Sequence, residues 1–385
     1  FNSDDGTDMS FSELNLDSRG ITGISNDNSD VQLVADQVIL SSSTGNELAG
    51  VGAMANASAL NVSADRINLD DGTFQVQGFD MVNLTAGSAL LLTGSGELIA
   101  EGPLNIDTPV AAGTTGVEYT ITAQGGKLSF TGGDPLASIP DSVGLAAALN
   151  LQGDAIDFAG RVALPSGQVT LNQLGDIGSP VSGNDIEISS GAIIDVAGIT
   201  QEFGPETLVT GGGNIILLAE TGDIRIADGS ELNVSAGLDV SEAGGIQLKS
   251  ENGQTSIASN TAFVADGSGG DFILDSDTLE AGGIDDALAY TELSKVLGDS
   301  FKDQRYMRLR SQGIEHGELL TVTAHHISLV SDSESVTIRG TIDASGQGMD
   351  TVYEDGGTIM IAAGDSVDIE STAVLLATGT QDDSG

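Results

Sequence analysis

Short stretches in which apolar and polar residues alternate recur along most of the chain. In 223–237 (DIRIADGSELNVSAG), two isoleucines alternate with polar residues, an Asp-Gly-Ser turn follows, and a leucine and a valine then alternate again. A period of two places every second side chain on one face of a β-strand, so this pattern predicts strands of three to five residues. The same unit recurs at 185–198, 336–346 and 367–379, with looser copies at 67–78 and 82–94.

Pairs of glycines open several of these strands and give the repeat its length. They stand at 212–213, 244–245, 269–270 and 356–357, and the first three pairs begin 32 and 25 residues apart. Three short strands with their turns fill such an interval. Repeats of 20–50 residues are typical of solenoids and propellers.

The strand lengths favour a solenoid. A sandwich needs longer strands joined by two-residue hairpin turns, and a propeller normally carries repeated aromatic blade motifs. In stacked coils, each short strand gains a parallel neighbour about 4.8 Å above and below it. The sequence therefore predicts an all-β fold, a parallel β-helix, as one continuous rod over 1–385. We interpret it as part of a longer chain.

One region departs from the alternation. Helical spacing fits 285–313 better than alternation, through Leu288, Glu292, Leu293, Val296 and Leu297. Acidic residues precede them, and Gly298 offers a stop. We expect a short helix and loop extruded from the rod, with the strand resuming at 306–309, and a second small excursion at 137–151. The first region also gathers basic residues, which form a candidate interaction patch: Lys295, Lys302, Arg305, Arg308 and Arg310.

Composition and charge narrow the partners. Asp and Glu number 57 against 12 Lys and Arg, for a net charge of -45, so nucleic acids and anionic membrane surfaces are repelled. The absence of cysteine excludes disulfides and thiolate metal sites. No apolar run reaches the 18 residues of a membrane span. Aromatic residues make up only 4%, so the core must be built from Val, Ile, Leu and Ala.

From residue 180 onward, the order of the motifs carries a family resemblance. The stretches 211–237, 269–279, 306–313, 336–346 and 356–379 resemble the very large bacterial exoproteins similar to filamentous haemagglutinin. The resemblance implies a right-handed β-helix, export through an outer-membrane secretion partner, and an extracellular or cell-surface location. It also implies roles in adhesion, aggregation or filament assembly, with a glycan or a host or neighbouring cell surface as partner.

The sequence contains no residue pattern to which we assign a catalytic or metal-binding site. His325 and His326 are adjacent in an expected strand, so we expect them on opposite faces, unable to share a metal; His316 stands apart. Acidic pairs such as Asp275 and Asp277 suit a glycosidase or lyase, but turn acids on a solvated face explain most of these positions, and we favour that interpretation. The same holds for the pairs at 70–71, 285–286 and 382–383. We expect no cofactor, and only adventitious calcium at oxygen-rich stretches such as 27–30 and 267–272.

Three functions therefore stand beside one another: a structural and adhesive segment, which we favour; a β-helix enzyme acting on polysaccharides; and a carbohydrate- or cation-binding module. A groove lined by several acids and an arginine on one face favours the second. For the basic patch, neutralisation of the acidic wall beneath it is the first interpretation, and contact with a neighbouring molecule is the second.

Overall fold

The computed structural model describes residues 11–23, 30–43, 57–175, 185–204, 206–238, 240–345 and 355–379. Within them the chain is all-β, with mainly parallel strand pairing and a single short helix, which confirms the predicted class. The strands fall into two compact units, described separately below. Unit 1 comprises Phe1–Leu164, Gln168–Ile186 and Gly191–Ile194, and unit 2 comprises Pro165–Gly167, Glu187–Ser190 and Asp195–Gly385.

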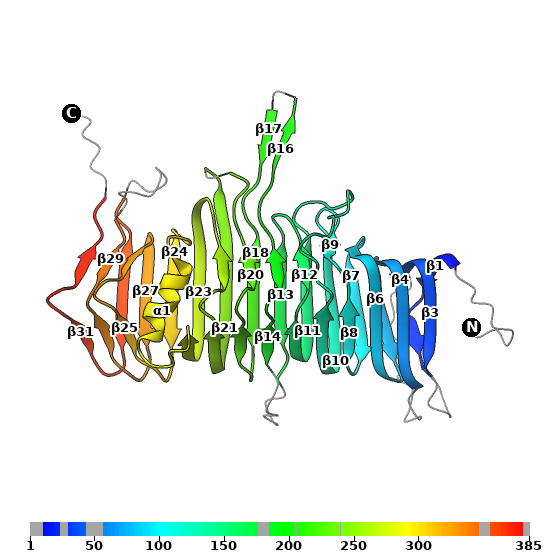
Figure 1. Cartoon of the computed structure of the whole chain (residues 1–385), viewed down its shortest axis with the longest axis horizontal. Coiled ribbons are helices and arrows are strands. Elements are labelled where there is room, and N and C mark those ends of the chain that lie inside the picture. The colour runs from blue at the N-terminus through cyan, green and yellow to red at the C-terminus, as the bar shows by residue number, and fades with distance from the viewer. Residues whose placement is uncertain are drawn as a thin grey trace. The chain divides into compact units, whose positions relative to one another are not determined.

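In unit 1, most strands pair in parallel with a strand about 20–30 residues further along the chain (blue to green in Figure 1). One inward row runs through Phe74, Leu98, Ile121, Leu151 and Leu171, all fully buried. The strands are β1 (Phe11–Asp17), β2 (Gly20–Thr22), β3 (Val31–Ser41), β4 (Ala57–Leu69), β5 (Gly72–Gln77), β6 (Phe79–Leu92), β7 (Gly96–Glu101), β8 (Leu104–Asp107), β9 (Ala111–Gly113), β10 (Glu118–Thr131), β11 (Ala148–Phe158), β12 (Arg161–Ala163) and β13 (Gln168–Gln173).

Unit 2 is also built from strands that pair mainly in parallel with strands further along the chain. Its elements are β16 (Thr200–Phe203), β17 (Glu206–Val209), β18 (Asn214–Ala219), β19 (Ile224–Ile226), β20 (Glu231–Asn233), β21 (Glu242–Ile257), β22 (Ala262–Val264), β23 (Ser268–Ala281), α1 (Ala289–Leu297), β24 (Gln304–Leu309), β25 (Ile314–His316), β26 (Thr321–Thr323), β27 (His326–Ser331), β28 (Val336–Ile338), β29 (Thr341–Asp343), β30 (Thr358–Ala363), β31 (Val367–Ile369) and β32 (Val374–Leu376). Two further strands, β14 (Ile186–Ile188) and β15 (Ile193–Asp195), have residues in both units.

The strands of unit 2 form three walls, and the register of the first wall shows how coils stack. Leu217 lies opposite Leu248, Leu248 opposite Leu274, Leu274 opposite Met307 and Met307 opposite Leu329. Every one of these side chains is buried. Each therefore removes apolar area from water between the coil before it and the coil after it, a gain of about 1.5–3 kcal/mol per large side chain.

The glycine pairs act through close backbone approach. A Cβ on Gly244 would lie 1.7 Å from the carbonyl oxygen of Gly213, in the preceding coil. No side chain fits at that distance, so glycine at this strand entry allows adjacent coils to hydrogen-bond.

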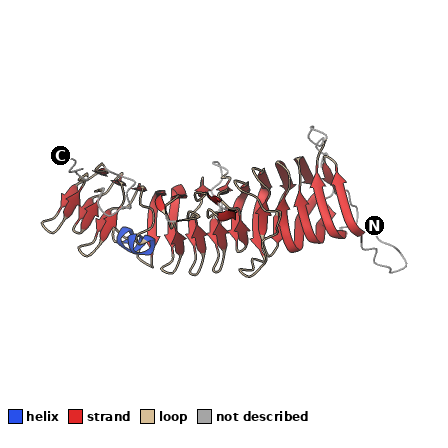
Figure 2. Ribbon diagram, turned by 90° about the horizontal axis from the view of Figure 1, so that it is seen from above, coloured by secondary structure: helices blue, strands red, loops and turns tan. Residues whose placement is uncertain are grey.

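The helix α1 interrupts two of the three walls (blue in Figure 2). The first wall is continuous from β23 to β24, whereas β25–β28–β31 and β26–β29–β32 form separate three-stranded sheets. The helix packs on the body through buried Ala289, Tyr290, Leu293 and Leu297, with β22, β23 and β25 as neighbours. It lies inside the predicted region 285–313, packed against the strands of unit 2 rather than extruded from them.

Several details differ from the sequence expectations. β21 has 16 residues, far more than predicted, because its pairing continues around a corner from the first wall into the second. The hairpin of β16 and β17 is antiparallel, projects from unit 2 (Figure 1), and was not expected. In unit 1 the connection before β11 is irregular, and the Arg161 guanidinium binds its carbonyl oxygens at Asp134, Pro135 and Ala137.

Candidate functional site: the basic patch and a polar groove

The five basic residues of the predicted patch are not gathered on one surface. Lys295, on α1, is exposed and pairs with Glu292 at 2.7 Å. Lys302 is half-buried, and its backbone connects two coils by donating to Gly269 and accepting from His325. The remaining three lie on or directly after β24, and they divide between the inside and the outside of the wall.

Arg305 points inward. It occupies the row between Phe272 and Ile327 and is only 6% exposed. Its guanidinium donates to the carbonyl oxygens of Gly298 at 2.5 Å, of Phe301 at 3.3 Å, and of Ser300. Burial lowers the pKa of Arg305 from its ordinary value. Arg305 therefore binds the segment that follows α1 to the neighbouring strand, and its charge is buried rather than exposed on the surface.

Arg308 and Arg310 belong to a network of alternating charges on the outer face. Arg308 pairs with Asp332 at 2.9 Å, and Arg310 contacts Asp275 at 2.8 Å and Glu251 at 3.3 Å. Desolvation raises the pKa of Asp275 although both arginines act to lower it, and the hydrogen bond with Lys249 lowers the pKa of Glu251. These partners agree with neutralisation within the molecule, the first interpretation of the patch.

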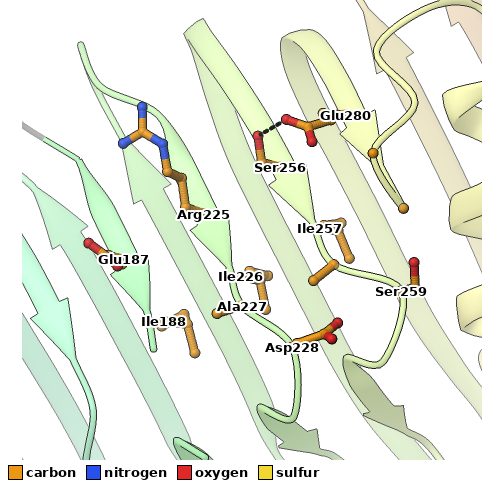
Figure 3. Close-up of a pocket in the computed structure, with 13 residues that line it drawn as sticks. Glu187, Ile188, Arg225, Ile226, Ala227, Asp228, Ser256, Ile257, Ser259 and Glu280 are labelled. Atoms are coloured by element: carbon orange, nitrogen blue, oxygen red, sulfur yellow. Dashed lines mark hydrogen bonds between the residues drawn. The ribbon is translucent and has the colours of Figure 1, made fainter. Parts of the chain in front are cut away.

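A groove that is rimmed by polar side chains over a small apolar floor lies elsewhere in unit 2, with a volume of about 400 Å³. One side is a row of outward side chains from successive coils: Glu187, Arg225, Ser256 and Glu280 (Figure 3). Arg225 lies opposite Ser256, and Ser256 opposite Glu280. The Ser256 hydroxyl donates to Glu280 at 3.1 Å. Because the row follows the stacking direction, its members are about 4.8 Å apart.

Small residues at the corner of each coil make the hollow. Ala227 and Ala258 follow the buried Ile226 and Ile257, and Gly282 takes the equivalent place after Ala281. The other side of the groove consists of the turn residues Asp228, Ser259 and Gly283. Gly282 and Gly283 also begin the segment that leads to α1, so the departure of the chain toward the helix bounds one end of the groove.

The charges of the groove are held in place by neighbours. Asp228 accepts from both the backbone and the side-chain nitrogen of Asn260, each at 3.0 Å, and these bonds lower its pKa. Arg225 pairs with Asp223 at 2.5 Å. Three carboxylates line the groove against one guanidinium, so its potential is negative at neutral pH.

The other candidates of the sequence have structural partners. The rings of His325 and His326 are in contact, with centroids 4.4 Å apart, so the expectation of opposite faces is wrong: β27 begins only at His326, and His325 lies in the turn before it. His316 is buried beside Tyr290, and burial lowers its pKa. No group of three or more metal-ligating side chains occurs in the described part of the chain.

The acidic pairs are turn and surface residues. Asp71 accepts from the Ser95 N–H at 2.8 Å, and Asp286 accepts from the Leu288 N–H at 2.8 Å ahead of α1. Asp277 accepts from the Ser311 hydroxyl, and Asp275 pairs with Arg310 as above. The acidic pair at 382–383 and residues 27–29 of the first oxygen-rich stretch lie outside the described residues, and 268–272 of the second is the start of β23.

Sequence reasoning missed the groove. Its row joins residues that are 31 and 24 positions apart, and only the coil register shows that they meet. A usable signal was the repeated small residue after each apolar pair, as in Ile226-Ala227 and Ile257-Ala258.

Comparisons with family models, with curated proteins and with solved structures gave no match. The helix α1 has nine residues, and among the described helices none has the length and hydropathy to cross a membrane.

Proposed function

We propose that this chain is a structural and adhesive segment of a secreted cell-surface exoprotein, built as a right-handed parallel β-helix. The observation that carries the proposal is the coil-on-coil register, as in the buried row Leu217, Leu248, Leu274, Met307 and Leu329. A fold in which each coil contacts only its neighbours presents a long lateral surface from a thin core, which suits display and adhesion.

The surface chemistry supports an extracellular setting. A net charge of -45 keeps such a surface soluble and repels anionic lipids and nucleic acids. Following the resemblance to filamentous haemagglutinin-like exoproteins, we propose an outer-membrane secretion partner, and a glycan or a cell surface as the adhesive target.

Self-association into filaments is part of the proposal. It follows from the resemblance to filamentous haemagglutinin-like exoproteins, whose implied roles include filament assembly.

Electron microscopy and cell binding test the proposal. Purified chain is expected to form elongated particles or filaments and, when coupled to beads, to retain them on bacterial or epithelial cells. Compact particles, or beads that bind no better than beads carrying an unrelated acidic protein, contradict it.

A polysaccharide-processing enzyme is the second candidate, favoured by a groove lined with acids and an arginine. Catalysis by a carboxylate pair needs one acid held protonated, whereas the bonds from Asn260 favour the ionised form of Asp228. The enzyme and the adhesive segment are distinguished by incubating the chain with neutral and acidic polysaccharides. Assays for reducing ends and for the unsaturated product of a lyase then report any turnover. Turnover that is lost in Glu280→Gln would establish the enzyme.

A further inference from the structure

We propose that the groove of unit 2 is the adhesive site itself and that it binds a neutral, linear oligosaccharide along the stacking direction of the coils. The inference rests on the proposed adhesive function and adds to it the site, the ligand class and the residues.

The first argument is spacing. Successive coils place Arg225, Ser256 and Glu280 side by side in register, so polar groups recur about every 4.8 Å. An extended chain of pyranose rings advances by a similar distance per sugar, so one ring can face each coil. The volume of about 400 Å³ is within the range of ligand sites, about 300–1,000 Å³.

The second argument is hydrogen-bonding chemistry. A sugar hydroxyl both donates and accepts, so it needs acceptors and donors within reach. The carboxylates of Glu187, Glu280 and Asp228 accept, and the Arg225 guanidinium donates. The Ser256 hydroxyl, whose proton is donated to Glu280, can accept, and the Ser259 hydroxyl can do both. Bonds to charged groups are the stronger ones, and here they alternate along the row.

The third argument is preorganisation. Asn260 holds Asp228 by two bonds, Asp223 holds Arg225, and Ser256 orients Glu280. These side chains stand on stacked strands and their turns, so binding a ligand carries little entropic cost for ordering them.

Charge decides the kind of sugar. Three carboxylates against one guanidinium, on a chain with a net charge of -45, repel uronic acids and sulfated sugars. No aromatic side chain lines the groove, so stacking against sugar rings does not contribute. We therefore expect weak, repeated binding of neutral sugars, which suits an adhesin that acts in many copies.

The test is titration of the full chain with cellohexaose, maltohexaose, chitohexaose and a galacturonic-acid hexamer, followed by ligand-observed NMR. We expect saturable binding of at least one neutral hexamer and none of the acidic one. Glu280→Gln, which replaces a charged acceptor by a neutral one, and Arg225→Ala, which removes the guanidinium donor, should each weaken binding about tenfold. Ala258→Phe, which fills the groove floor, should abolish it.

Matched controls lie outside the groove. Arg308→Ala removes another exposed, ion-paired arginine of unit 2, and Glu318→Gln another exposed glutamate; both should bind like the parent. Circular dichroism confirms that each variant is folded, and a variant that does not fold is replaced by Ser256→Ala.

Binding of no neutral hexamer, equal binding by the groove variants, or preference for the acidic hexamer overturns the inference. Failure of the adhesive function is a separate result: the beads then fail to bind cells while the hexamer still binds the groove.

Discussion

The side-chain amide of Gln312 pairs with both backbone polar groups of Leu279, 33 residues earlier. Its Oε1 accepts from the Leu279 N–H at 2.6 Å, and its Nε2 donates to the Leu279 carbonyl at 3.0 Å and to that of Asp286. These are the bonds that a neighbouring strand would supply in the second wall, where the chain leaves for α1. A single buried side chain therefore completes a strand edge that the insertion leaves open.

Gln312→Ala is expected to destabilise unit 2 by about 1–3 kcal/mol, because the buried N–H and C=O of Leu279 lose their partner. Urea denaturation followed by circular dichroism measures the change. Gln247→Ala, on the outer face of β21, is the matched control and should alter the free energy of unfolding by less than about 0.5 kcal/mol. Equal effects of the two variants would mean that the pairing with Leu279 contributes nothing.

Arg305→Ala is expected to cost about 3 kcal/mol, because three carbonyl oxygens after α1 lose a buried donor. Arg305→Lys should recover only part of this loss, since an ammonium cannot reproduce the guanidinium fork. Arg308→Ala, on the outside of the same strand, should cost only about 0–1 kcal/mol. Hydrogen exchange at 298–301 reports the local effect, and unchanged protection there in Arg305→Ala would contradict it.

Leu293 anchors α1 with no exposed surface, whereas Leu319 is 99% exposed. Leu293→Ala should therefore lower the free energy of unfolding by about 2–5 kcal/mol, and Leu319→Ala should leave it nearly unchanged. Thermal melts of the two variants provide the comparison. If Leu293→Ala melts at the same temperature as the parent, the packing of α1 does not stabilise unit 2.

Asp271 should make stability depend on pH. Burial, and then the nearby Asp303, raise its pKa above the ordinary 3.8, against the opposing effect of His326. The folded chain thus retains a proton that the unfolded chain releases. The contribution of this carboxyl group to the free energy of unfolding is therefore fully present below pH 3.8 and is lost as pH rises through the raised pKa. Asp271→Asn should raise the melting temperature at pH 7 and not at pH 3.

Asp266→Asn is the control for Asp271→Asn, because it removes one negative charge at an exposed position of the same unit. It corrects for the general relief of repulsion in a strongly acidic chain. If both variants gain equally at pH 7, the burial of Asp271 has no specific effect.

The sequence predicted the strands well because alternation records which side chains face the core. The turn between Ile226 and Glu231, for example, falls where 223–237 places it. The same rule could have assigned Arg305 to the inside, since it shares its parity with Met307 and Leu309 on β24. The predicted patch grouped Arg305 with the other basic residues by charge alone, which does not indicate that its side chain faces the core.

Contacts between coils could not be predicted in the same way. Whether Ser256 meets Glu280 depends on the lengths of the connections between strands, and a shift of one residue reverses every side chain. The pairing of Gln312 with Leu279 also depends on the path of α1, which helical spacing predicts as an element but does not place. Periodicity therefore fixes which face a side chain is on, and the groove arises from which coils are neighbours.

The break that α1 makes in two walls has a consequence for cooperativity. In a stacked repeat, the stability of the whole depends on the coupling free energy between adjacent coils. Between the coil that ends at Ala281 and the one that begins at Gln304, strand pairing persists only in the first wall, with the helix and Gln312 supplying the rest. A mechanical load carried from coil to coil in unit 2 passes, at this junction, through that ladder, the packing of α1 and the bonds of Gln312, so we expect the unit to yield here first.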